Sequence, residues 1–175
     1  MRNILKNRTA LSTVVTTLII LVVSVLLAGV VTYFAINVTS TRVQEENLHL
    51  TKQHVWHNTT VAQAALMIVN TGGRDVVIDK IAVRGQDCAW GNVWYLVSAT
   101  TPTTDFEFNT TIADGSGAPY TNAATNIVLP SGKTLSVYVN SPDSISVNDI
   151  GLTVAISVFS AQAIYYKETN IQAAV

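Results

Sequence analysis

The stretch that decides the fold runs from Thr9 to Thr41 and reads TALSTVVTTLIILVVSVLLAGVVTYFAINVTST, without one charged side chain. From Ala10 to Ile36 it is almost wholly apolar. As a helix rising 1.5 Å per residue, this part would measure about 40 Å, more than the ~30 Å hydrocarbon core of a bilayer. Valine and isoleucine weaken a helix in water, but in lipid an unmade backbone hydrogen bond costs more, so we expect a helix. Its hydroxyls can bond to the carbonyl one turn earlier: Ser12, Thr13, Thr16, Thr17, Ser24 and Thr32.

The charges that flank this stretch indicate its orientation in a membrane. Three cations precede it, Arg2, Lys6 and Arg8, and one cation and two carboxylates follow it, Arg42, Glu45 and Glu46. The excess of positive charge keeps the N-terminal side in the cytoplasm, so the chain after Ile36 is expected outside the cell. An ordinary secretory signal peptide has an apolar region of only about 7–15 residues, which disfavours that interpretation. An uncleaved signal anchor stays open.

Composition excludes several classes of function. The chain has 175 residues, of which 49% are hydrophobic and 12% charged, with ten basic and eleven acidic side chains. This length allows one globular domain plus an accessory segment, and a net charge of -1 offers no field to attract nucleic acid. Cys88 is the only cysteine, and no Cys/His zinc spacing occurs. Because GxSxG, HExxH, P-loop and GxGxxG motifs are also lacking, we predict no enzyme activity, no metal and no cofactor.

The junction between the basic leader and the apolar stretch carries a resemblance to a known family. It reads Lys6-Asn7-Arg8-Thr9-Ala10-Leu11-Ser12-Thr13-Val14-Val15, and it resembles the class III signal peptide of archaeal type IV pilins. The resemblance implies that a prepilin peptidase cuts on the cytoplasmic side, between Ala10 and Leu11. Thr9 stands where that family usually has a basic residue, so a cut before Thr9 stays open. The stretch lacks the early acidic residue of bacterial pilins, which favours the archaeal branch.

The resemblance continues after the helix and implies a function. The run Asn70-Thr71-Gly72-Gly73-Arg74-Asp75, between two apolar runs within Ala64–Gly85, is similar to the first hairpin of archaeal pilin heads. Membership of that family would make the chain a structural subunit of a type IV pilus-like filament at the cell surface, serving adhesion and polymerising with copies of itself. Its other partners would be the membrane before assembly, a prepilin peptidase, an assembly ATPase with its platform, and glycans.

Polymerisation through the apolar helix has a physical basis. A rod extracted from lipid must bury itself against other rods, which gains on the order of tens of kcal/mol relative to water at ~25 cal/mol per Å2. The gain relative to lipid is far smaller, so an assembly motor is implied. Ser24 and Ala28 form a small-xxx-small pair that would allow two helices to approach closely. An archaellin of a motility filament, a minor pilin and a non-polymerising, signal-anchored extracellular binding module all stay open.

The residues after the apolar stretch turn polar, and we predict that the helix continues as a half-buried stalk. Val43 and Leu50, like Leu48 and Val55, are seven residues apart, which fits an apolar stripe on a helix. We expect the nearby histidines to be solvated or at an interface and not metal ligands: His49, His54 and His57. The predicted organisation is a leader at 1–10, a hydrophobic and stalk helix at 11–57 and a head at 58–175.

From Asn58 onward the apolar pattern changes to period two, which predicts strands. The runs are Ala64–Val69, Val76–Val83, Val93–Val97, Phe106–Thr110, Asn126–Leu129, Leu135–Asn140, Leu152–Phe159 and Ile164–Thr169. The second run changes phase near Asp79-Lys80, as a bulge requires. Turn signals separate the runs: Thr71-Gly72-Gly73, Asp114-Gly115-Ser116-Gly117, Pro130-Ser131-Gly132 and Ser141-Pro142-Asp143. The predicted fold class is α+β, a long N-terminal hydrophobic helix followed by an antiparallel immunoglobulin-like β-sandwich head.

Several residues of the head are of types that often occur in binding or catalytic sites. Aromatic side chains are expected to pack in the core and not to form a binding surface: Trp90, Trp94, Tyr95, Phe106 and Phe108. Cys88 is expected to be a buried small hydrophobe, and Asp105 and Glu107 to be solvent-facing acids on an edge strand and not a catalytic pair. Four Asn-x-Ser/Thr sequons occur, at Asn7, Asn37, Asn58 and Asn109. Asn58 and Asn109 are the expected N-glycan acceptors, because they belong to the extracellular head.

Overall fold

A computed structural model describes residues 8–113 and 119–174 of the chain. Most of the predicted leader and the turn signal at 114–117 lie outside the described residues. The chain divides into two compact units, the first ending at Val43 and the second beginning at Gln44. The first unit is helical and the second holds every described strand, which confirms the α+β class.

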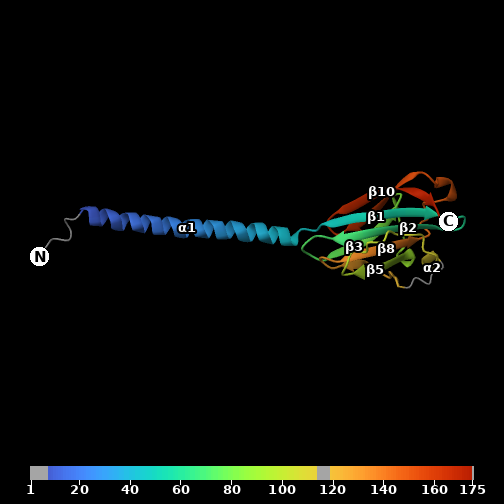
Figure 1. Cartoon of the computed structure of the whole chain (residues 1–175), viewed down its shortest axis with the longest axis horizontal. Coiled ribbons are helices and arrows are strands. Elements are labelled where there is room, and N and C mark those ends of the chain that lie inside the picture. The colour runs from blue at the N-terminus through green and yellow to red at the C-terminus, as the bar shows by residue number, and fades with distance from the viewer. Residues whose placement is uncertain (1–7, 114–118, 175) are drawn as a thin grey trace. The chain divides into compact units, whose positions relative to one another are not determined.

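The predicted apolar helix is confirmed as α1 (Arg8–Gln44), a continuous helix of 37 residues (Figure 1). Within it, Leu11–Thr41 are 31 residues with a mean hydropathy of 2.9, long and apolar enough to cross a membrane. Large apolar side chains between Leu11 and Val38 are 45% to 73% exposed, because a lone helix cannot cover its own surface. Hydroxyls bond back to the preceding turn as predicted: Thr16 to Ser12, Thr17 to Val14, Ser24 to Leu21 and Thr32 to Ala28.

The predicted stalk helix is wrong, because α1 ends at Gln44 and the residues Leu48–His57 form strand β1. Leu50 and Val55 are both buried, although five residues apart in a regular strand they would point to opposite faces. A bulge in the β1 pairing around Lys52, whose φ is +53°, inserts an extra residue and restores the phase. This extra residue also places Leu48 and Val55 seven residues apart on one face of the strand, a spacing that resembles a helical stripe.

The second unit, called the head below, contains the remaining strands. They are β2 (Ala62–Asn70), β3 (Val76–Val83), β4 (Gln86–Asp87), β5 (Val93–Ser98), β6 (Thr121–Asn122), β7 (Ile127–Leu129), β8 (Thr134–Asn140), β9 (Thr153–Ser160) and β10 (Ile164–Ala173). Short helical turns join them in the described part of the head: η2 (Trp90–Asn92), α2 (Thr110–Ala113) and η3 (Val147–Asp149). The predicted strand at Phe106–Thr110 is wrong, because that segment is irregular and leads into α2.

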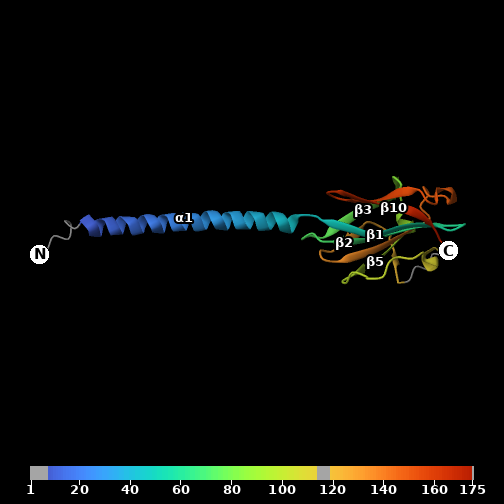
Figure 2. The same ribbon diagram turned by 45° about the horizontal axis from the view of Figure 1, so that its top comes forward.

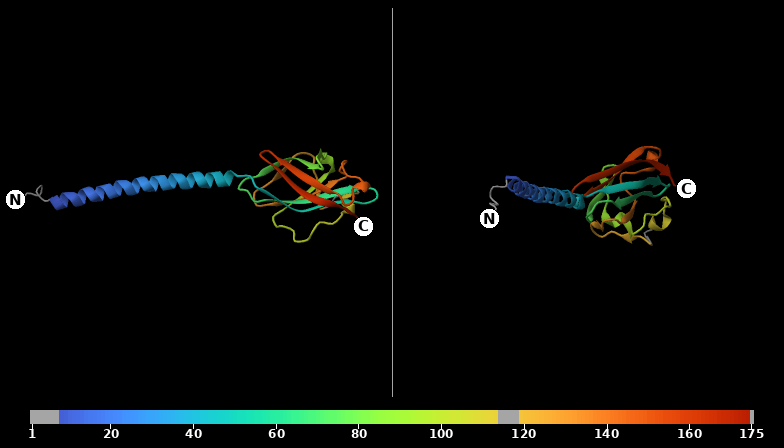
Figure 3. Two further views of the ribbon diagram at one scale, coloured as in Figure 1. Left: turned by 90° about the horizontal axis from the view of Figure 1, so that it is seen from above. Right: turned by 60° about the vertical axis from the view of Figure 1, so that its left-hand side comes forward.

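The strands form one hydrogen-bonded sheet in the order β4-β3-β9-β10-β1-β2-β8-β5-β6, with β7 paired to β3. β10 joins its two halves, since Ile164–Asn170 pair with β9 and Ile171–Ala173 pair with β1. Figure 2 shows β3 and β10 on one side of the head and β5 on the other. The β1–β10 pair is parallel, which corrects the expectation of an antiparallel head. The immunoglobulin-like sandwich is not confirmed, because the halves belong to one curled sheet (Figure 3).

The turn after β2 joins the two halves of the sheet. The expected hairpin within Ala64–Gly85 is wrong, because β2 pairs with β1 and β8 whereas β3 pairs with β4, β7 and β9. The predicted bulge in β3 is confirmed, since its register with β9 shifts between Ile78 and Lys80. The turn therefore carries the chain from one half of the sheet to the other.

The main core lies between the two halves. Leu66 and Val137 from one half and Ile81 and Ile156 from the other line the same interior space and are at most 2% exposed. A second, smaller cluster lies on the opposite face of β1, β2 and β8 and contains Trp56, Ala65, Ile112 and Tyr138. The sheet half that includes β1, β2 and β8 is thus covered on both faces, which is why Ala64–Val69 of β2 form a continuous apolar run.

The first residues of the head are fixed to the turn after β2. The Asn47 carbonyl accepts hydrogen bonds from the backbone N–H groups of Thr71 and Gly72, at 2.9 and 3.2 Å. A Cβ on Gly72 would lie 2.6 Å from the Glu45 carbonyl oxygen, so this position requires glycine. At the end of β9, the Ser160 hydroxyl donates to the Glu46 carboxylate. The chain therefore enters the head through a well-anchored segment.

Candidate functional site

The residues predicted to act in processing and helix packing all lie on α1. The Ala10–Leu11 bond is in its first turns, and Leu11 is 66% exposed. Ser24 and Ala28 are one turn apart, and the Ser24 hydroxyl donates to the Leu21 carbonyl at 2.8 Å. Because that hydroxyl is satisfied within the helix, Ser24 presents a small and nearly apolar surface to a neighbour.

The predicted glycan acceptor Asn58 lies in the loop between β1 and β2. Its Oδ1 accepts hydrogen bonds from the N–H groups of Thr60 and Val61, at 2.7 and 2.6 Å. Asn58 is half-buried, whereas Thr59 and Thr60 are exposed. Only the oxygen of the amide is used in these bonds, and the nitrogen is the atom that a glycan would take.

The second predicted acceptor, Asn109, caps helix α2. Its Oδ1 accepts from the N–H groups of Thr111 and Ile112 and from the Thr111 hydroxyl. The Gln63 side chain bonds to both backbone groups of Asn109, and Gln63 is the second residue of β2, just after the Asn58 loop. The two sequons therefore lie at the same end of the head. Residues 45–47 lie at the other end, because the ten residues of β1 span about 33 Å.

The connection Ala99–Asn109, called the strap below, crosses the second cluster without forming a strand. Phe106 and Phe108 pack on that cluster, and Phe106 meets Tyr138 edge to face with ring centroids 5.3 Å apart. Side chains from the sheet hold the strap by its main chain. The Tyr138 hydroxyl donates to the Glu107 carbonyl at 3.1 Å, and Gln63, fully buried, bonds to Asn109 at 2.7 and 3.1 Å.

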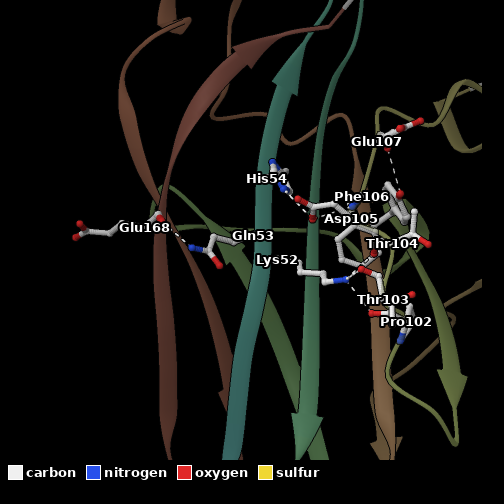
Figure 4. A network of polar contacts seen from close by, with 11 residues as sticks. Lys52, Gln53, His54, Pro102, Thr103, Thr104, Asp105, Phe106, Glu107 and Glu168 are labelled. Carbon is white, nitrogen blue, oxygen red and sulfur yellow. Dashed lines mark hydrogen bonds and ion pairs between the residues drawn. The ribbon is translucent and has the colours of Figure 1, made fainter.

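Lys52 holds the first part of the strap (Figure 4). Its Nζ donates to three carbonyl oxygens, those of Pro102, Thr103 and Thr104, at 2.8, 2.9 and 2.6 Å. Lys52 stands at the bulge of β1 in the left-handed region, a conformation that costs a non-glycine residue free energy. The bulge directs Lys52 to the strap, while Gln53 points to the other side and donates to the Glu168 carbonyl at 3.3 Å (Figure 4).

His54 holds the next part of the strap. Its Nε2 lies 3.1 Å from the Asp105 carboxylate, and its ring stacks on Trp56 with centroids 5.1 Å apart and planes 8° from parallel. The His54 Nδ1 is buried and has no hydrogen-bond partner among the described residues. Slight burial raises the pKa of Asp105, but the Phe106 N–H, His54 and Lys52 outweigh it and lower that pKa below its ordinary value.

The structure revises the roles predicted for several head residues. Asp105 and Glu107 do not lie on an edge strand, because the strap is irregular, and Asp105 is paired with His54. The prediction that aromatic residues pack in the core is confirmed: Trp90 and Tyr95 pack on the main core, and Trp94, Phe106 and Phe108 on the second cluster. Cys88, predicted to be buried, is half-buried against the main core, and this burial raises its pKa to about 11, so its thiol is protonated at neutral pH.

Sequence reasoning missed the strap contacts. Nothing in the spacing of Lys52, His54 or Gln63 indicates that they bind a segment about 50 residues later in the chain. The alternation of apolar and polar residues in β1 breaks near Lys52, and this break was the available sign of the strap contacts. A bulge often redirects a side chain toward a functional contact. Within the described residues, no group of three or more His, Cys, Asp or Glu side chains could hold a metal ion.

Comparisons with known proteins do not assign the chain to a family. No protein-family model matches it, and no curated protein matches it. Among solved structures, it is similar to the "Copper-bound PCuAC domain from PmoF2", with 13% identity and a TM-score of 0.35, over 74% of this chain and 99% of that chain. A likeness at this identity and TM-score assigns neither a fold family nor a copper site.

Proposed function

We propose that the chain is the structural subunit of an archaeal type IV pilus-like extracellular filament that polymerises through α1. The length of the apolar part of α1 carries this proposal. Leu11–Thr41 would measure about 46 Å as a helix, whereas about 20 residues suffice to cross a bilayer. A tether needs no such excess, but a rod that must bury itself among other rods gains from every added turn.

The character of the α1 surface supports the same role. Apolar side chains lie on all its sides, and its hydroxyls bond to its own carbonyls, so the helix can exchange lipid for neighbouring helices without leaving polar groups unpaired. Close contacts between such helices would be made at small residues, and Ser24 with Ala28 provides one such position. The leader would be removed between Ala10 and Leu11 before assembly.

In this proposal the head forms the exterior of the filament and serves adhesion. Its halves would act as the two layers of an immunoglobulin-like sandwich around the main core. Asn58 and Asn109 would carry N-glycans, and both lie at the end of the head away from residues 45–47, where a glycan would not obstruct the entry of the chain. Mass spectrometry of native protein tests this: Thr60→Ser and Thr111→Ser should keep the glycans, and Thr60→Ala and Thr111→Ala should lose them. Unmodified native protein would refute it.

Replacement of Ala10 tests the proposed function. In a host with a prepilin peptidase, Ala10→Trp should block the cut, so that the protein accumulates in the membrane with its N-terminus at Met1 and filaments are lost. Asn3→Trp is the matched control, because it adds the same side chain to the leader away from the cut. Normal filaments from the Ala10→Trp chain would favour a signal-anchored binding module. Swimming of a deletion strain separates a pilus from an archaellum.

A further inference from the structure

The strap is fixed to the sheet at contacts of two kinds. Lys52 binds carbonyl oxygens of residues 102–104, and an ammonium bound to carbonyls keeps its charge throughout the neutral pH range. His54 binds the Asp105 carboxylate, and histidine side chains in general change their charge between about pH 5 and 8. The contact of the Lys52 ammonium with the carbonyls therefore keeps its strength near neutral pH, whereas a contact between a histidine and a carboxylate does not.

We propose that the contact between His54 and Asp105 is a pH-sensitive device, which fixes the second part of the strap, residues 105–108, over the aromatic cluster in mild acid and loosens it above neutral pH. With His54 protonated, the contact is an ion pair as well as a hydrogen bond, and the charged ring lies against the face of Trp56. With His54 neutral, both electrostatic contributions are lost. The hydrogen bond between the two side chains then remains without the ion pair, and the strap is held mainly by Lys52, Tyr138 and Gln63.

The surroundings of His54 leave Asp105 as its main electrostatic partner. On β1 the nearest titratable group is Lys52, whose Nζ is occupied by the strap carbonyls. On β2 the neighbour in register is Ala65, and on β8 Tyr138 donates to the Glu107 carbonyl. On β10 Glu168 lies on the far side of β1 and its side chain points away from His54 (Figure 4). Glu107, in the strap, is exposed.

The direction of the pH effect on the strap follows from the charges of the Asp105 and histidine side chains. Asp105 has a pKa below its ordinary value, so its carboxylate stays charged through the mildly acidic range. Histidine is the side-chain type of this pair that changes its charge near neutral pH, so an ion pair is expected in mild acid and not above neutral pH. Asp105 is 63% exposed, and a partly exposed ion pair of this kind shifts an opening equilibrium by about two- to fivefold. The opening exposes Trp56, Tyr138 and the two phenylalanines of the strap.

Hydrogen exchange of the full chain in detergent micelles tests the device, with rates at pH 5.5 and 8.0 each divided by the intrinsic rate at that pH. We expect the protection factors of the amides of residues 105–108 to be about two- to fivefold lower at pH 8.0 than at pH 5.5. The protection factors of residues 100–104 should be equal at the two pH values. His54→Gln should lack the difference and exchange at both pH values like the native protein at pH 8.0. His49→Gln is the matched control, because His49 is exposed on the same strand, and it should behave like the native protein.

Three results would overturn the inference: equal protection of residues 105–108 at both pH values in the native protein, a pH difference that persists in His54→Gln, or a pH difference that disappears in His49→Gln. Unchanged protection of β2 and β8 amides in each variant verifies that the head is folded. Asp105→Asn provides a second variant should His54→Gln fail to fold. It removes the charge on the strap side and should abolish the same pH difference, and its persistence there would also overturn the inference.

Discussion

Replacement of Gln63 by methionine measures how strongly the strap depends on side chains of the sheet. Gln63 is fully buried, and its amide takes the place of a strand partner for Asn109, accepting from its N–H at 2.7 Å and donating to its carbonyl at 3.1 Å. Methionine has nearly the same length and volume but can replace neither bond. The change therefore removes two hydrogen bonds with little change in packing.

The expected loss of stability follows from the groups left behind. Asn109 is half-buried, so its N–H and carbonyl are only partly able to turn to water. Each buried group without a partner costs about 1–3 kcal/mol, so Gln63→Met should lower the free energy of unfolding by about 2–4 kcal/mol. Gln53→Met is the matched control, since Gln53 makes one 3.3 Å bond at an exposed site, and such a change alters stability by about 0.5 kcal/mol or less.

Denaturant unfolding of the full chain in detergent, followed by tryptophan fluorescence, measures both variants. All three tryptophans, Trp56, Trp90 and Trp94, belong to the head, so the signal is independent of α1. A loss for Gln63→Met below about 1 kcal/mol, or equal to that for Gln53→Met, would refute the argument that these two bonds fix the strap.

Two further predictions concern other parts of the head. Gly72→Ala should destabilise the head by about 1–3 kcal/mol in the same unfolding assay, because the new Cβ would meet the Glu45 and Asn47 backbones at 2.6 and 2.8 Å. Gly91→Ala, where a Cβ meets nothing within 4 Å, should cost far less, and equal losses would contradict the clash. Cys88 should react with iodoacetamide at pH 7.5 at least about 100-fold more slowly in folded than in unfolded protein, since burial raises its pKa to about 11; similar rates would disprove its burial.

The parts of the fold that could be predicted from sequence are those with regular periodicity. The absence of charge from Thr9 to Thr41 was sufficient to predict α1, and strict alternation was sufficient for β8 and β9. The bulge in β3 could also be predicted, because its phase change lies inside an otherwise continuous apolar run. In each case the pattern depends on local burial alone.

Prediction failed where tertiary contacts override periodicity. The bulge at Lys52 gives β1 a spacing of apolar residues typical of a helix, so the sequence predicts a stalk helix where the structure has a strand. The strap has alternating Phe106 and Phe108 like a strand, but side chains such as Gln63 occupy the positions where a neighbouring strand would bond. The pairing of β10 with β1 joins residues more than 110 positions apart, and no local signal encodes it.

The central claim is that α1 assembles copies of this chain into a filament, and electron microscopy of protein sheared from the surface of native cells tests it most directly. We expect filaments with a core of packed α1 helices, heads on the outside and subunits whose density begins at Leu11. Discrete single-copy particles, or protein that stays in the membrane with its leader intact, would contradict it.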